Sequence, residues 1–129
     1  MKTIKQTVSF NASPHEVFEL LMDSKKHAGF TGSKAKISRA KNGKIEAYDG
    51  WIEGNNLEIA KDKRIVQLWR GADWPIGHFS KVQFLLEKKG ASTKLTFIQT
   101  DVLDEQYKHI NQGWKDQYWE KMKIYLKHQ

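Results

Sequence analysis

Residues 103–127, LDEQYKHINQGWKDQYWEKMKIYLK, form the most regular pattern in this chain of 129 residues. Apolar side chains recur there every three or four positions, at Leu103, Tyr107, Ile110, Trp114, Tyr118, Met122 and Tyr125. This spacing puts them on one face of a helix, which we predict from about Asp104 to Lys127 with a length of about 35 Å. A face so rich in aromatic rings must be buried against another layer of the protein.

The chain upstream of this helix predicts the layer that covers it. Alternating residues 3–10 predict a first strand. Six further short strands, separated by turn sequences, are expected at Lys34–Arg39, Lys44–Tyr48, Trp51–Ala60, Arg64–Arg70, Phe79–Glu87 and Thr93–Asp101. Such short connections require antiparallel pairing. We therefore predict one α+β domain over residues 1–129, in which a curved seven-stranded antiparallel sheet grips the C-terminal helix.

Two short helices are expected between the first strand and the rest of the sheet. Ser13, Pro14 and Glu16 form a helix start, with a cap, a proline at the first helical position and a capping-box glutamate. A second helix is predicted from Asp23 or Ser24 to about Ala28, where glycines at positions 29 and 32 should end it.

The charge of the chain is concentrated in one segment. The sequence has 22 Lys and Arg against 15 Asp and Glu, and seven of these basic residues lie between Ser24 and Ile45, where no acidic residue occurs. The rest of the chain is therefore neutral, which excludes a uniformly basic arm. The segment fits either a sheet edge guarded by lysines or a surface for an acidic protein partner. Nucleic acid is disfavoured because residues 34–44 lack aromatic side chains for stacking.

Candidate docking residues follow from this charge and from one tryptophan in a loop. Trp74, followed by Pro75, is either an exposed contact residue or a ring folded over a cavity mouth. The candidate set is Lys34, Lys36, Arg39, Lys41, Lys44 and Trp74.

Several classes of chemistry are excluded or disfavoured. The absence of cysteine excludes disulfides, thiolate metal sites and cysteine nucleophiles. The five histidines show no metal-binding spacing and are expected at the surface or at helix ends, and no cofactor is predicted. Asp101, Asp104 and Glu105 could form an acid–base or cation site, but helix capping and complementarity to the helix dipole explain them more simply. No nucleophile motif occurs, so we expect binding and not catalysis.

The N-terminus lacks a signal-peptide pattern and no apolar run could span a membrane, so we expect a cytoplasmic protein without membrane contact.

A cavity between sheet and helix is the second candidate site. Two strand glutamines, Gln67 and Gln99, alternate with apolar residues and would bury amides that need partners. A ligand, a water or a Trp or Tyr donor could supply them. Simple core packing and an apolar ligand pocket both remain open. The candidate residues are Phe18, Gln67, Trp69, Phe84, Phe97, Gln99, Ile110, Trp114 and Tyr118.

Several motifs together resemble a known family. The matching stretches are Phe10–Pro14, Phe30–Gly32, Asp49–Gly54, Ile65–Arg70 followed by Trp74-Pro75, Thr93–Phe97, and Gly113-Trp114 through Tyr118-Trp119. Together they cover essentially the whole chain. They resemble the activator of heat shock protein 90 ATPase homologues, within the START-like superfamily, also called SRPBCC or birch-pollen-allergen-like.

The resemblance is to the C-terminal domain of the eukaryotic co-chaperones, which carry a separate N-terminal domain for most of the ATPase stimulation. It implies a helix-grip fold and a non-catalytic binding role, chaperone-associated or stress-related, with an acidic partner of the heat shock protein 90 type. The alternatives are a binder of a small hydrophobic ligand and an enzyme of the cyclase or hydrolase kind. We expect a monomer or a weak dimer.

Overall fold

A computed structural model describes residues 1–128 of the chain. Its elements are β1 (Lys2–Phe10), α1 (Pro14–Met22), α2 (Ser24–Thr31), β2 (Lys36–Ile37), β3 (Lys44–Ala47), β4 (Ile52–Ala60), β5 (Arg64–Gly71), β6 (Ser80–Lys89), β7 (Ser92–Val102), the 3₁₀ turn η1 (Asp104–Gln106), α3 (Tyr107–Gly113), the π-helical segment η2 (Trp114–Trp119) and α4 (Glu120–Lys127). The predicted fold class is confirmed. No helix within residues 1–128 is long and apolar enough to cross a membrane.

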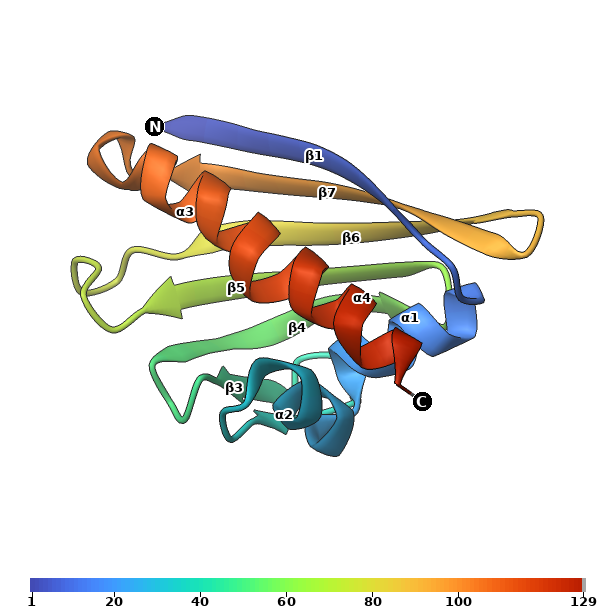
Figure 1. Cartoon of the computed structure of the whole chain (residues 1–129). Coiled ribbons are helices and arrows are strands. Elements are labelled where there is room, and N and C mark those ends of the chain that lie inside the picture. The colour runs from blue at the N-terminus through green and yellow to red at the C-terminus, as the bar shows by residue number, and fades with distance from the viewer. Residues whose placement is uncertain (129) are drawn as a thin grey trace.

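The seven strands form one sheet in the order β1-β7-β6-β5-β4-β3-β2, and all neighbours pair antiparallel. The consecutive strands from β2 to β7 are joined by short connections, as the turn sequences predict. Only β1 pairs out of chain order, because it lies beside β7. The C-terminal helix crosses one face of this sheet, with α1 and α2 near its C-terminal end (Figure 1). The helix and the sheet therefore form the two layers that enclose the core.

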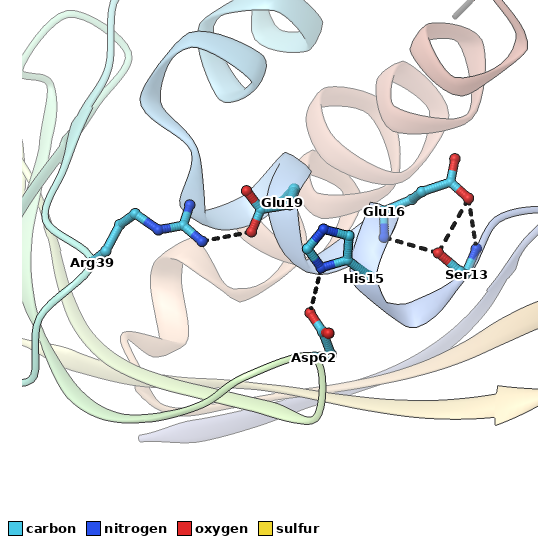
Figure 2. Close-up of polar contacts among 6 residues, drawn as sticks. All are labelled: Ser13, His15, Glu16, Glu19, Arg39 and Asp62. Atoms are coloured by element: carbon cyan, nitrogen blue, oxygen red, sulfur yellow. Dashed lines mark hydrogen bonds and ion pairs between the residues drawn. The ribbon is translucent and has the colours of Figure 1, made fainter.

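The cap residues begin α1 as the sequence predicts. The Ser13 side chain accepts a hydrogen bond from the Glu16 backbone, and the Glu16 carboxylate accepts one from the Ser13 backbone, as Figure 2 shows. The predicted end of α2 is wrong, because the helix continues through Gly29 to Thr31. Gly32, with φ of +78°, ends it in the left-handed conformation. Gly29 stays helical, and Tyr125 packs against its bare α-carbon.

The predicted strand at Lys34–Arg39 is also wrong in its length, since only Lys36 and Ile37 pair with β3. The following residues are held by a side chain instead of a strand ladder. The Asn56 amide donates to the carbonyl oxygens of Ser38 and Ala40, at 2.7 and 2.9 Å. The sheet therefore ends at this side in a very short edge strand, which limits pairing with other chains.

The predicted C-terminal helix exists, but it is not α-helical throughout. It begins with a 3₁₀ turn and contains η2, in which the Glu120 N–H bonds the Lys115 carbonyl five residues earlier. In an α-helix, residues five apart point about 140° away from each other. The wider π turn brings Trp119 to the same side as Trp114, and their rings stack with centroids 5.5 Å apart. Both tryptophans are therefore buried, although the apolar period includes only Trp114.

Candidate functional site

Three tryptophans are tied to glutamines on the inner face of the sheet. Each indole N–H donates to the side-chain oxygen of one glutamine. The pairs are Trp69 with Gln67 at 2.8 Å, Trp114 with Gln99 at 2.8 Å, and Trp119 with Gln6 at 2.6 Å. The need for amide partners that the sequence raises is thus met by protein donors. These bonds fix the orientation of the rings, because a buried indole N–H without a partner would be costly.

The side-chain amides of Gln67 and Gln99 also donate hydrogen bonds within the protein. Gln67 donates to the Asn56 side-chain oxygen at 3.0 Å, and Gln99 donates to the Ser80 hydroxyl at 3.0 Å. Ser80 in turn donates to the Thr100 carbonyl. The chain of donors and acceptors runs from the helix through the sheet, so no ligand is needed to satisfy either amide.

Most of the space between sheet and helix is filled by aromatic side chains. Phe97 and Trp114 have ring centroids 4.1 Å apart, and Phe84 lies 5.3 Å from Phe97. The space beside His27 and Gln67 measures about 10 Å³, which is room for about one water. The expectation of simple packing therefore describes this part of the interior.

A pocket of about 240 Å³ opens at one end of the same interface. It lies between the first half of the C-terminal helix and the ends of β4 and β5. Six of its lining residues are aromatic: Tyr48, Trp51, Trp69, Trp74, Trp114 and Tyr118. Ile52 and Ile110 add apolar surface, and the side chains of Asp73, Gln106, His109 and Gln117 add polar groups. The composition is that of a ligand site, mostly apolar with a few polar groups.

The loop between β3 and β4 forms one wall of the pocket, and its backbone is strained at two residues. Tyr48 and Asp49 have φ of +51° and +56°, a conformation that costs a bulky residue such as tyrosine about 1–3 kcal/mol. The Tyr48 hydroxyl donates to the Gln117 carbonyl at 3.1 Å, and burial raises the pKa of Tyr48 to about 12. The loop is thereby attached to the π-helical segment across the pocket mouth. Strained residues and π turns both concentrate at functional sites.

A buried histidine supports the inner wall. His27 is 2% exposed, and its Nε2 lies 2.6 Å from the Tyr118 hydroxyl. Burial lowers the pKa of His27 to about 4, so the imidazole is neutral at physiological pH. Burial also raises the pKa of Tyr118 well above 10, so the phenol stays neutral as well. The expectation that the histidines lie at the surface or at helix ends is wrong for His27.

The nine predicted cavity residues fall into three groups. Those that line the pocket are Trp69, Gln99, Ile110, Trp114 and Tyr118. Those that lie beneath it, in contact with these rings, are Gln67, Phe84 and Phe97. Phe18 is buried elsewhere, on α1, where the Arg39 guanidinium lies 5.9 Å from its ring. Tyr48 and Trp51 also line the pocket but are absent from the predicted set. They flank the Asp49-Gly50 turn, which in the sequence indicates only a connection between strands.

Trp74 does not have the exposed position that a docking residue needs. It is 8% exposed and packs on Gly71, where a Cβ would lie 2.9 Å from the indole nitrogen. Arg70 holds the loop by donating to the Trp74 carbonyl at 2.6 Å. The ring therefore covers the pocket, the alternative left open by the sequence. The exposed apolar side chains nearby are Trp51, at 51%, and Ile76, at 97%.

The basic segment lies at the β2 edge, as expected of a guarded edge. The Ser24 hydroxyl accepts from the Ile37 N–H at 2.8 Å, so the start of α2 lies against β2. Arg39 pairs with Glu19 at 2.6 Å (Figure 2), and Lys44 pairs with Glu46 at 3.6 Å. Five exposed lysines make no ion pair within residues 1–128, and we call them the basic edge: Lys25, Lys26, Lys34, Lys36 and Lys41.

Within residues 1–128, no three His, Asp or Glu side chains converge in a way that could hold a metal ion. The prediction that acidic residues cap the last helix is wrong, because Leu103 is the N-cap and no side chain bonds there; Asp104 and Glu105 do lie in the first turn, where the helix dipole favours them. Asp104 pairs with the amino terminus at 3.1 Å, and the Asp101 carbonyl lies 2.8 Å from His78 Nε2.

Comparison with known proteins gives concordant matches. The human activator of 90 kDa heat shock protein ATPase homolog 1 is 28% identical over 94% of this chain and 35% of its own length. The Dictyostelium discoideum homolog is 29% identical over 88% of this chain and 30% of its own length. The chain thus spans about a third of the curated relatives that it matches.

The fold has a near relative among solved structures. The crystal structure of an Hsp90 activator from Plasmodium falciparum superposes with a TM-score of 0.92 at 21% identity, covering 98% of this chain and 96% of that one. The profile of the family described as "Activator of Hsp90 ATPase homolog 1-like protein" matches residues 11–127. The chain therefore belongs to this family, with the helix-grip fold of the START-like superfamily.

Proposed function

We propose that this chain is a non-catalytic docking module for a chaperone of the Hsp90 type. The observation that carries the proposal is the family match over residues 11–127, together with relatives that are named as activators of the Hsp90 ATPase. The chain covers about a third of those relatives. The proposal is therefore limited to binding and does not include stimulation of the ATPase.

The basic edge is the surface that we assign to this docking. Its lysines come from α2, β2 and the turn before β3, and the Ser24–Ile37 bond brings the first two together. Because these five charges have no ion-pair partners within residues 1–128, they are available to an acidic partner. Exposed charges of this kind mainly steer association, and their effect is screened by salt.

Titration of a purified Hsp90-type chaperone with the chain tests this proposal, by calorimetry at 50 and 300 mM salt. Reversing Lys34, Lys36 and Lys41 to glutamate should weaken binding by at least about tenfold at low salt. Wild-type affinity should fall as the salt concentration rises. The matched control reverses three exposed lysines elsewhere, Lys5, Lys88 and Lys108, and should lose much less.

Equal losses in the two triple variants would assign the effect to net charge and would contradict the assigned surface. Absence of any binding by the wild-type chain, at either salt concentration, would contradict docking itself.

Binding of a small molecule is the second candidate function, favoured by the pocket of about 240 Å³ beneath the first half of the C-terminal helix. The two candidates use different surfaces, because none of the basic-edge lysines lines this pocket. A thermal-shift screen against small apolar and amphiphilic compounds tests it. Stabilisation that is lost on replacing Trp51, a half-exposed lining residue, would support this function.

A further inference from the structure

The pocket presents aromatic rings whose polar atoms are already engaged within the protein. Trp69 and Trp114 give their indole hydrogens to strand glutamines. The Tyr118 hydroxyl is bonded to His27, and the Tyr48 hydroxyl donates to a carbonyl on the helix. Trp69, Trp114 and Tyr48 therefore have no free donor to offer a ligand. They offer carbon surface and the electron-rich faces of their rings.

The rings of the inner wall therefore offer little to a ligand that is recognised as a hydrogen-bond acceptor. Carboxylates, phosphates and carbonyl compounds need donors that point into their site. At the inner wall such ligands would have to break a buried bond of the network, at the cost of an unsatisfied partner, and the other donors of the lining are those of Gln106, His109 and Gln117. What the rings can attract is an apolar group or a positive charge, because the face of an aromatic ring carries negative potential.

The charge of the pocket distinguishes these two alternatives. Its one carboxylate is Asp73, on the loop after β5, and no Lys or Arg of residues 1–128 is among the lining residues. Asp73 makes no ion pair within the described chain. An exposed carboxylate beside an aromatic lining that contains no Lys or Arg gives this pocket a negative charge, which favours a cationic occupant over a neutral one.

We propose that this pocket binds a small organic cation of the quaternary-ammonium class, through ring faces and the Asp73 carboxylate. The inference deepens the second candidate function above and rests on it. Ligands bound by rings and one carboxylate have a bulky, weakly hydrated positive head and few hydrogen-bonding groups. The volume of about 240 Å³ is below the range of about 300–1,000 Å³ typical of drug-sized ligands, which limits the cation to a few heavy atoms around its charge.

The site is also largely preformed. The glutamine bonds fix Trp69 and Trp114, and Gly71 sets the position of Trp74. Tyr48 is held in a strained backbone conformation by its loop and by its bond to the helix. Rings fixed in this way lose little entropy when a ligand enters. Trp51, half exposed at the mouth, is the ring with most freedom to close over it.

Choline chloride is the probe for the test, with 3,3-dimethylbutan-1-ol as its neutral counterpart of the same shape. Binding of each to the full chain is followed by tryptophan fluorescence and calorimetry, against sodium chloride of equal ionic strength. We expect choline to bind at least about tenfold more tightly than the alcohol. Asp73→Asn should weaken choline binding about three- to tenfold and leave the alcohol unaffected, whereas Trp51→Leu should weaken the binding of both and that of choline more.

The control variant is Asp62→Asn, which removes a carboxylate from the opposite end of β5, where Asp62 pairs with His15 (Figure 2). It should bind choline like the wild type. Equal affinity for choline and the alcohol would overturn the cation assignment and leave small-molecule binding standing. Failure of both probes to bind would overturn the inference, and only failure of the wider thermal-shift screen would also remove the second candidate function.

Discussion

The stability of this protein should fall steeply between pH 6.5 and pH 4 because of one buried histidine. His27 is 2% exposed and contacts Phe30 and Tyr118, whose rings lie 5.0 and 5.4 Å from its own. Its Nδ1 has no hydrogen-bond partner within residues 1–128. No carboxylate is bonded to the ring there, so a protonated imidazole at this place would be a buried charge without compensation.

The sign and size of the effect follow from the two pKa values of His27. Burial lowers the folded-state pKa to about 4, from 6.5 for an exposed histidine. As the pH falls through 6.5, the unfolded chain takes up a proton that the folded chain does not, and the free energy of unfolding decreases. The limit is about 1.4 kcal/mol per pH unit, which gives a loss of roughly 3 kcal/mol over the interval. Below the folded-state pKa both states are protonated, and this contribution becomes constant.

Urea unfolding at pH 7, 6, 5 and 4, followed by tryptophan fluorescence, measures this loss. Carboxylates also titrate in the range, so the informative quantity is the difference between the wild type and His27→Gln. The glutamine can still bond the Tyr118 hydroxyl but does not titrate. We expect this difference in unfolding free energy to shrink by roughly 3 kcal/mol from pH 7 to pH 4.

The control is His128→Gln, which removes an exposed imidazole at the end of the helix and should follow the wild type at every pH. Parallel pH profiles for the wild type and His27→Gln would refute the reasoning. An NMR titration that gave His27 an ordinary pKa would refute it independently, because the imidazole would then have to be hydrated.

Three substitutions test the packing around the pocket by urea or thermal unfolding. Gln99→Leu removes the acceptor of the Trp114 indole and should cost about 1–3 kcal/mol, whereas a cost near zero would mean that this bond is unimportant. Gly54→Ala should cost at least about 3 kcal/mol, because the new methyl group would collide with the Leu68 carbonyl on the paired strand; a neutral result would disprove this close approach. Gly113→Ala meets no atom within 4 Å and is helical, so it should stabilise the protein by up to about 1 kcal/mol, and a loss would show that the start of the π segment needs glycine.

The order of strands and helices could be predicted because it depends on local patterns. Alternation in β7 puts Leu95, Phe97 and Gln99 on the buried face, as their spacing requires. The cap at Ser13 and the turn sequences act within a few residues. These patterns depend only on residues that are close together in the chain, so they can be identified without knowing which strand or helix packs against them.

The π-helical segment could not be predicted in this way. The spacing of Trp114 and Tyr118 fits an α-helix, and only the burial of Trp119 requires the wider turn. The buried indole N–H of Trp119 is satisfied by Gln6, which lies 113 residues earlier on β1. The same holds for His27, whose environment is set by Tyr118, 91 residues later. A helix with a weak apolar pattern gives no local sign that one of its polar residues is in the core.

The sequence could not show whether the aromatic residues fill a core or line a pocket, because the same side chains do both in this protein. The indole of Trp114 packs on Phe97 and also faces the pocket. The choice is made by hydrogen bonds that hold the rings at fixed angles, and by Gly71, which lets Trp74 lie close to the sheet. A change of one side chain at these positions would alter the volume without changing the fold.

The two candidate sites adjoin, and this decides which variants can separate their functions. The Asp49 N–H donates to the Lys34 carbonyl at 2.9 Å, which attaches the loop of Tyr48 to the basic edge. Because the bond is between backbone atoms, charge reversal at Lys34 leaves it intact and acts on docking alone. Substitution of Tyr48 would release a strained loop that contributes to both surfaces, and its effect could not be assigned to either. Asp73 lies on the loop after β5, which carries none of the basic-edge lysines, and is therefore the position at which ligand binding can be changed without removing a docking charge.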